Sequence, residues 1–192
     1  MTAPNDAALP TMTAVARTRR FAGLLAVHVR RFWFAWLLLF ACFWMFRDNY
    51  RLVPNATRSL PQSWFLVHLN EEVHRGDFVS FLAPDNGVYP PAFWWVKRVV
   101  GVPGDRLTRE GLNYFVNGEL VATARLIGLS GRTLAPLQLP PVNPADPSRF
   151  AYYLKGDEYF VVGTHPFSFD SRYAPIGLIR REQMKGRAHA IY

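Results

Sequence analysis

The 192-residue sequence predicts a mainly β domain of antiparallel sheets, preceded by one N-terminal transmembrane helix. Two observations carry this prediction. Residues 32–46 form an uncharged apolar run, whereas beyond Arg51 short runs of β-branched and aromatic residues alternate with Pro, Gly, Asn and Asp. Half of all residues are hydrophobic and 15% are aromatic, which suffices for one folded domain with a sizeable core beside the helix.

The first 20 residues predict a basic cytoplasmic N-terminus. The chain has a net charge of +8, and residues 1–31 supply +4 of it, because Asp6 stands against five arginines: Arg17, Arg19, Arg20, Arg30 and Arg31. A basic cluster indicates a nucleic-acid or a membrane partner, and the adjacent apolar run favours membrane lipid and no nucleic acid. Because positive residues stay on the cytoplasmic side, everything after residue 46 is expected outside.

Residues 21–48 are expected to form the membrane anchor, in one of two geometries. A spanning helix needs about 20 residues, so one helix could extend from about Phe21 to Phe46 with Arg30 and Arg31 reaching the inner interface. Alternatively, an amphipathic stretch lies on the surface before a short span. A cleaved secretory signal is disfavoured, because no small-residue cleavage site follows the run. Cys42 is the single cysteine, so no intrachain disulfide can form.

Residues 49–192 are predicted to form the exported β domain. Asn117 and Gly118 separate two short runs and indicate a tight hairpin. Residues 123–150 contain five prolines and predict an extended excursion or lid rather than a helix. The predicted strands are 64–69, 77–82, 93–100, 106–109, 114–116, 119–121, 159–162 and 188–192.

Lys97 is the most informative residue of this domain. In a strand over 93–100 it shares a face with Trp95 and Val99, while Arg98 points the other way. An amine among apolar side chains loses hydration, which disfavours its charged form and suits a general base near neutral pH. The alternative is a lysine that extends its stem and keeps its ammonium in water.

Two further segments carry hydroxyl and charged groups. Ser59 lies in a loop stiffened by Pro61, and an extended backbone would place the Thr57 hydroxyl on the same side. A serine needs a base to become a nucleophile, and Thr57 with the Ser59 amide would form an oxyanion hole. Farther on, Asp170 and Arg172 are close enough in sequence to pair, and Ser168 offers a hydroxyl to a neutral amine.

Taken together, these segments resemble the type I signal peptidases, a family of serine–lysine proteases. Residues 97–105 follow the family's Lys-Arg-x-x-x-x-Pro-Gly-Asp signature, and residues 168–172 match its Ser-x-Asp-Ser-Arg box. Ser59 lies where the nucleophile is expected, 38 residues before Lys97. The resemblance implies coiled antiparallel sheets for the domain.

The resemblance also implies a role for each residue. Ser59 would be the nucleophile and Lys97 the general base. Thr57 falls at the hydroxyl residue of the oxyanion hole, and Ser168 falls at a serine that orients the lysine. Asp170 and Arg172 fall at an ion pair that braces the site.

Several positions depart from the housekeeping leader peptidases. Leu60 replaces a methionine, and Thr164 stands where those enzymes usually carry an aspartate. The Asn-x-Thr-x-Ser-x-Pro spacing of residues 55–61 is similar to the TraF-type subgroup, which matures pilin subunits in conjugation systems. Even there, Ser63 stands where that pattern tends to have glycine.

Competing interpretations have less support. A Ser-His-Asp hydrolase through His165 lacks the Gly-x-Ser-x-Gly elbow around Ser59. His68, Glu72 and His74 do not have the spacing of a helical zinc-protease motif, and residues 70–72 favour a solvated turn. A self-cleaving repressor would begin with a DNA-binding domain, whereas the first 46 residues here contain an arginine cluster and an apolar run. A non-catalytic, membrane-tethered scaffold of a secretion apparatus remains the main rival.

We therefore expect a serine endopeptidase with a Ser/Lys dyad, without a cofactor or a metal. Its expected place is the cytoplasmic (inner) membrane, single-pass, with the catalytic domain periplasmic or extracytoplasmic. Its expected partners are membrane lipid and an exported precursor protein. This precursor is either a conjugative pilin or another signal-bearing preprotein. Oligomeric state, substrate identity, and cleavage versus cyclisation of the product are left open by the sequence.

Overall fold

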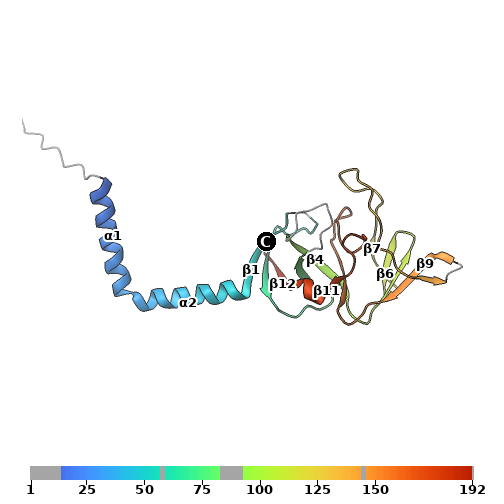
Figure 1. Ribbon diagram of the computed structural model, residues 1–192, viewed down its shortest axis with the longest axis horizontal. Helices are drawn as coiled ribbons and strands as arrows, with labels where there is room; N and C mark the ends of the chain where they lie inside the picture. The colour runs from blue at the N-terminus through green and yellow to red at the C-terminus, as the bar shows by residue number, and fades with distance from the viewer. Residues whose placement is uncertain (1–13, 57–58, 83–92, 144–145, 192) are drawn as a thin grey trace, which may run out of the picture. The chain divides into compact units, whose positions relative to one another are not determined.

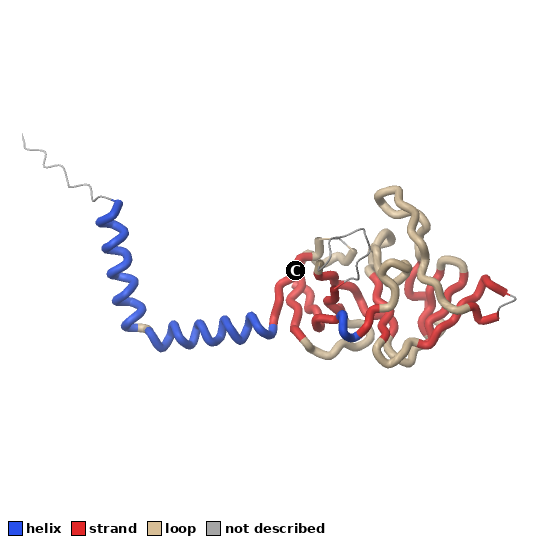
Figure 2. Tube along the Cα trace, in the orientation of Figure 1, coloured by secondary structure: helices blue, strands red, loops and turns tan. Residues whose placement is uncertain are grey.

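A computed structural model describes residues 14–56, 59–82, 93–143 and 146–191. The chain falls into two compact units, Met1–Arg47 and Asp48–Tyr192. The described part of the first unit is helical, whereas beyond residue 49 the regular secondary structure consists of β-strands and one 3-10 turn, joined by loops, as Figures 1 and 2 show.

The N-terminal unit contains two helices instead of one. Helix α1 spans Ala14–Arg31 and α2 spans Trp33–Asn49. The break falls where arginine-containing sequence gives way to the uncharged run, although neither Pro nor Gly lies there to cause it. Among the described residues, no single helix is long and apolar enough to cross a membrane; Thr18–Arg31 and Trp33–Asn49 meet that test only together, with a bend of 84°. The expected single helix over residues 21–48 is therefore not confirmed.

The second unit contains two antiparallel sheets among its described residues. The larger has seven strands in the order β1-β2-β12-β3-β4-β10-β11. The strands are β1 Tyr50–Pro54, β2 Trp64–Leu69, β3 Phe78–Leu82, β4 Trp94–Gly101, β10 Glu158–Val162, β11 Ile179–Arg180 and β12 Met184–Ile191. A single 3-10 turn, η1 at Arg181–Gln183, joins β11 to β12.

The smaller sheet has five strands in the order β7-β6-β5-β9-β8. Its strands are β5 Arg106–Glu110, β6 Asn113–Val116, β7 Glu119–Thr123, β8 Pro141–Asn143 and β9 Asp146–Tyr153. Figure 1 shows β6, β7 and β9 gathered at one end of the domain and β1, β4 and β12 at the other. The prediction of a mainly β, antiparallel domain is confirmed.

The alternation of side chains along β4 divides the apolar core. Trp95 and Val99 join the larger cluster, which also contains Leu107 and Tyr114 of the smaller sheet. Val96, between them, joins a second cluster with residues of β1, β2 and β12. Strand β4 is therefore buried on both faces over part of its length, which holds its side chains in fixed directions.

The predicted hairpin is confirmed in its turn chemistry. Asn117 and Gly118 join β6 to β7, with positive φ angles of 52° and 89°. Two positive φ angles are what a type I′ turn requires, and its twist matches that of the flanking strands.

The proline-rich stretch 123–150 is more ordered than an excursion. Its last part forms β8 and most of β9, and β9 pairs with β5 over residues 149–153. Pro147 lies before this paired part, so its missing N–H removes no hydrogen bond to β5. The proline content of this stretch does not indicate β9. The β-prone Phe-Ala-Tyr-Tyr run of this strand begins only at Phe150, where the stretch ends.

Candidate active site

Strand β4 carries Lys97 into the interior of the domain. The lysine is 1% exposed and lies on the same face as Trp95, while Arg98 points outward and is exposed. Its ammonium nitrogen lies 5.1 Å from the centroid of the Trp95 ring. The predicted division of these side chains between the two faces of the strand is therefore confirmed.

Ser59 lies in a short loop that Asn55 closes. The Asn55 side-chain amide donates to the carbonyl oxygens of Leu60 (2.7 Å) and Gln62 (2.8 Å), and its backbone amide donates to Ser63. Leu60 is buried in the second core cluster and fixes the loop from the other side. In the sequence, Asn55 is only the first residue of the Asn-x-Thr-x-Ser-x-Pro spacing, although an Asx side chain that caps a loop is a known turn signal.

The structure brings Ser59 and Lys97 together. Lys97 Nζ donates a hydrogen bond to Ser59 Oγ, although 38 residues separate them, and Ser59 is only 2% exposed. Burial lowers the pKa of Lys97 to about 8; the charge of Asp170 opposes this lowering and that of Arg172 adds to it. The amine beside the serine hydroxyl is therefore neutral more often near pH 7 than that of an ordinary lysine.

A buried ion pair supports this part of the domain. Asp170 accepts hydrogen bonds from Arg172 Nε and Nη2, both at 2.8 Å, and from the Gly163 amide. Arg172 also donates to the carbonyl oxygens of Ser168 and Thr123. The predicted pairing of Asp170 with Arg172 is present, and each partner has several further contacts that compensate for its lost hydration.

Ser171, which lies between Asp170 and Arg172 in the sequence, attaches this segment to β10. Its hydroxyl accepts from the Val161 amide, and its own amide donates to the Val161 carbonyl oxygen. The carboxylate of Asp170 is directed at Arg172 and Gly163, so the contacts of the described residues do not form a Ser-His-Asp arrangement.

Ser168 is buried near the dyad, but its hydroxyl has a different environment from the one expected. Its Oγ makes no hydrogen bond within the described ranges. A Cβ atom added to Gly163 would lie 2.2 Å from Ser168 Oγ and 2.8 Å from the Ser59 carbonyl oxygen. Glycine is therefore required at 163, where the backbone packs directly between the two serines.

Thr57, the expected oxyanion-hole residue, lies outside the described residues. Of the aromatic residues of β2 and β3, Phe65 and Phe81 are completely buried and belong to the core, while Trp64 is exposed.

The Pro-Gly-Asp end of the lysine signature forms a braced turn. Asp105 accepts hydrogen bonds from Arg75 (2.5 Å), Asn117 (2.8 Å) and the Val102 amide (2.8 Å). Burial would raise the pKa of Asp105, but these hydrogen bonds outweigh it and hold the pKa below its usual value. The turn thus fixes the end of β4, four residues after Lys97, to the hairpin of the smaller sheet.

Comparison with known proteins identifies the class to which this fold and site belong. The family described as signal peptidase, peptidase S26, matches residues 25–192. This range includes Ser59, Lys97 and the whole β domain. The chain therefore belongs to the signal peptidase family, peptidase S26.

Two individual proteins are similar to this chain. Signal peptidase I V of Bacillus subtilis (strain 168) is 32% identical over 120 residues, which cover 62% of this chain and 66% of that protein. The chain thus matches just under two thirds of the length of that relative. A crystal structure of a signal peptidase I from Enterococcus faecalis V583 has 20% sequence identity, covers 61% of this chain and 97% of that chain, and superposes with a TM-score of 0.37.

Proposed function

We propose that this protein is a serine endopeptidase that processes exported precursor proteins, with Ser59 as nucleophile and Lys97 as general base. The observation that carries the proposal is the hydrogen bond between Lys97 Nζ and Ser59 Oγ inside a buried site. Membership of the signal peptidase family supports the same activity.

Acylation follows from the chemistry of this pair. The neutral Lys97 amine takes the Ser59 proton as Oγ attacks the scissile carbonyl carbon. The resulting ammonium then donates that proton to the leaving amine as the peptide bond breaks, which leaves an ester on Ser59. Lys97 returns to its neutral form in the same step.

Deacylation uses the same base once more. Lys97 takes a proton from a water molecule, the hydroxide attacks the ester, and the proton returns to Ser59 Oγ as the acid product leaves. The buried Asp170–Arg172 pair does not exchange protons in this scheme. It holds the main chain of Gly163 and Ser168 against the dyad.

An apolar pocket beside β4, the strand that carries Lys97, supports a substrate that binds in extended form. It has a volume of about 410 Å³ and lies between β1 and the start of β4. Trp94 of this pocket precedes Lys97 by three residues, about 10 Å along the strand, and lies with Val96 on its opposite face. Leu52, Val53, Pro54 and Phe93 supply most of its remaining surface. Small apolar side chains before the scissile bond suit such walls.

The finer assignment is pilin maturation in a conjugative transfer system at the outer face of the cytoplasmic membrane. Its support is the TraF-like spacing of residues 55–61, together with the basic and apolar composition of α1 and α2. General removal of signal peptides is the second candidate, favoured by the similarity to signal peptidase I V of Bacillus subtilis.

Cleavage assays with the full chain test this proposal. A pilin precursor and an unrelated signal-bearing precursor are incubated with wild type, Ser59→Ala and Lys97→Ala. We expect no cleavage with Ser59→Ala and a loss of about 10²–10⁴-fold with Lys97→Ala. Ser63→Ala and Lys155→Ala, which alter exposed residues, serve as matched controls and should retain activity. Cleavage that survives Ser59→Ala would rule out the proposed nucleophile.

The two precursors separate the finer assignments. Preferential cleavage of the pilin supports conjugative maturation, whereas equal cleavage of both supports general signal-peptide removal. In either case the rate should rise with pH through about 8, because only the neutral Lys97 amine accepts the proton.

A further inference from the structure

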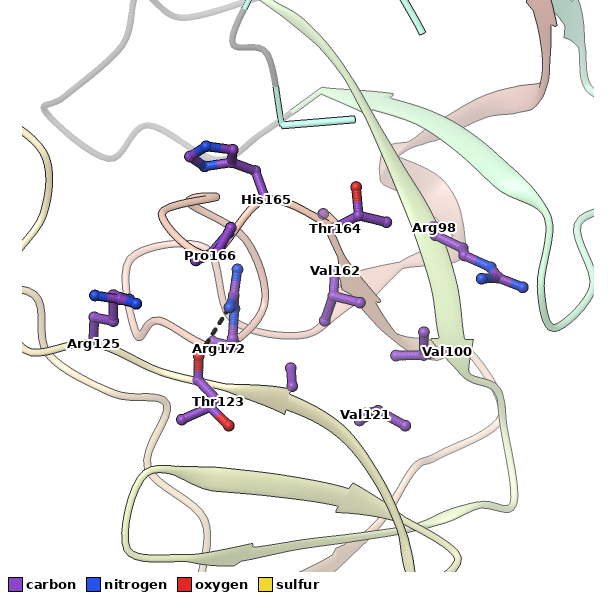
Figure 3. Close-up of a pocket in the computed structure, with 12 residues that line it drawn as sticks. Arg98, Val100, Val121, Thr123, Arg125, Val162, Thr164, His165, Pro166 and Arg172 are labelled. Atoms are coloured by element: carbon purple, nitrogen blue, oxygen red, sulfur yellow. Dashed lines mark hydrogen bonds between the residues drawn. The ribbon is translucent and has the colours of Figure 1, made fainter. Parts of the chain in front are cut away.

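A second pocket lies beside the chain segment that contacts Ser59. It has a volume of about 360 Å³, near the lower end for ligand sites. Its floor is apolar and comes from Val100, Val121, Ala122 and Val162. Figure 3 shows Arg125 and Arg172 on one side of this space and His165 above it. The proposed reaction uses none of the exposed groups around it.

The charge of this pocket is positive. Three arginines line it, Arg98, Arg125 and Arg172, and none of its lining residues in the described part of the chain is an aspartate or glutamate. Arg98 extends away from Arg172 in Figure 3, and its Nε donates to the Gly76 carbonyl oxygen at 3.3 Å. Arg125 and Arg172 are therefore the two guanidinium groups directed at the space itself.

Both groups are held in place before any ligand arrives. The Arg125 guanidinium lies 4.4 Å from the centroid of the Phe167 ring, a stacking that limits its motion. The buried Arg172 guanidinium has five N–H donors, and four of them bind Asp170, Ser168 and Thr123. The fifth, on Nη1, has no acceptor among the described residues.

The wall of the pocket is also the wall of the proposed catalytic site. Gly163, Thr164 and His165 line the pocket. The His165 amide donates to the Ser59 carbonyl oxygen at 3.1 Å. One segment of chain thus has the nucleophile on one side and the cationic pocket on the other, so a polypeptide lying across Ser59 has the pocket within reach of its neighbouring residues.

We infer that this pocket binds an acidic side chain of the substrate polypeptide, which makes Arg125 a specificity-determining residue. The inference rests on the proposed function. The carboxylate would lie between the Arg125 guanidinium and the remaining Nη1 donor of Arg172, and its methylene groups would lie on the apolar floor. Charged hydrogen bonds of this kind are the stronger class in proteins.

The shape of the pocket favours a carboxylate on a side chain over a lipid phosphate. The floor offers four aliphatic side chains and only a narrow donor set, which suits one planar anionic group on a short apolar stem. A phosphate is tetrahedral rather than planar and generally meets several donors that surround it. Of the three arginines that line this pocket, only Arg125 and Arg172 are directed at the space, because Arg98 extends away from it.

A peptide series tests the inference with the full-length enzyme. One cleavable sequence is prepared with a single Glu or Gln at successive positions on both sides of the scissile bond. At one position we expect kcat/KM for the Glu peptide to exceed that for the Gln peptide by about tenfold, the size of one favourable charged contact. In Arg125→Gln this ratio should fall to about one. Arg132→Gln removes an equally exposed arginine outside the pocket and should keep the ratio.

Binding to Ser59→Ala provides a readout independent of catalysis. A fluorescent Glu peptide should bind the full-length Ser59→Ala protein about tenfold more tightly than its Gln counterpart, and Arg125→Gln should remove the difference. If wild type cleaves none of the peptides, the proposed function fails. The binding ratio still shows whether the pocket binds an acidic side chain. A ratio near one at every position, or one that persists in Arg125→Gln, overturns the inference. So does an Arg125-dependent preference for anionic over neutral vesicles without any Glu preference, which would identify a lipid phosphate as the ligand.

Discussion

Two groups of charged side chains in this domain differ in how deeply they are buried. Asp170 and Arg172 have side chains that are 0% and 4% exposed, and each makes several hydrogen bonds. The second group surrounds Glu71, whose carboxylate meets His68, His189 and Arg187 while remaining 28% exposed. Both connect distant parts of the sheet system, yet only the first lies beside Ser59 and Lys97.

The comparison shows that similar contacts have different energetic weight. An exposed ion pair stabilises little, because water replaces the lost partner at low cost. A buried pair contributes little net stability, but removing one partner leaves an uncompensated charge in the interior. We therefore expect the protein to tolerate changes around Glu71 and to be sensitive to any change around Asp170.

The largest effect is expected for Arg172→Met. This substitution keeps an apolar stem but leaves the Asp170 carboxylate buried without its cation, so the free energy of unfolding should fall by about 3–5 kcal/mol. Urea denaturation of the full chain in detergent measures this loss. The double variant Asp170→Leu/Arg172→Met should be less destabilised than Arg172→Met alone. A loss below about 1 kcal/mol in the single variant would mean that the buried pair behaves like an exposed one.

Lys97→Met should stabilise the protein, since Lys97 is a buried cation and, among the described residues, Asp170 forms its ion pair with Arg172 instead. Its pKa is lowered from 10.5 to about 8, and each pKa unit corresponds to about 1.4 kcal/mol. Below pH 8 the wild type therefore carries a penalty of up to about 3 kcal/mol. Between pH 8 and 10.5 the unfolded chain binds more protons than the folded one, so wild-type stability rises with pH.

Urea denaturation of wild type and Lys97→Met at pH 7 and pH 10 measures this difference. The variant should be the more stable protein at pH 7, and its advantage should shrink at pH 10. An advantage that does not change with pH would contradict the lowered pKa. Loss of cleavage in a more stable variant would show that the site is built at the expense of stability.

Gly163→Ala should reduce activity more than stability. The added methyl group would collide with Ser168 Oγ and with the main chain of Ser59. Displacing a reacting group by about 1 Å can cost about a hundredfold in rate, so we expect kcat/KM to fall by about that factor. Gly156→Ala, where a Cβ atom would meet nothing within 4 Å, is the matched control. An active Gly163→Ala enzyme would show that the loop beside Ser59 is not tightly constrained.

The two charged groups also differ in how far the sequence predicts them. Asp170 and Arg172 are two residues apart, so proximity in sequence already indicates the pair. Glu71 meets His189 across 118 residues, and this contact depends on the register that pairs β2 with β12. The sequence correctly indicates a turn near Glu71, where Asn70 has a positive φ of 61°. It predicts a strand over 188–192 but contains no local signal that this strand pairs with β2.

The same distinction applies to the candidate site. The direction of Lys97 follows from strand alternation, which is a local property. Its contact with Ser59 follows from the family resemblance, because no local pattern fixes a loop 38 residues away. The closing role of Asn55 and the requirement for Gly163 emerge only from packed coordinates. The break between α1 and α2 is likewise not indicated by Pro or Gly.

The smallest effect is expected for Glu71→Gln, which removes the charge shared by His68, His189 and Arg187. At pH 7 the free energy of unfolding should fall by less than about 1 kcal/mol, and added salt should reduce the difference further. Hydrogen bonding from His189 is the main cause that lowers the pKa of Glu71. The stability that Glu71 contributes is therefore present above its ordinary pKa and is lost as the pH falls through the lowered value.

Urea denaturation of Glu71→Gln and of the neighbouring control Glu72→Gln, at pH 7 and in mild acid, measures this contribution. The gap between wild type and Glu71→Gln should close on acidification, opposite in direction to the gap produced by Lys97→Met on alkalinisation. The contributions of Glu71 and Lys97 to stability can therefore be separated by pH alone. A loss of about 3 kcal/mol or more in Glu71→Gln would mean that water does not compensate for the missing charge. The partly exposed cluster would then behave like the buried ion pair.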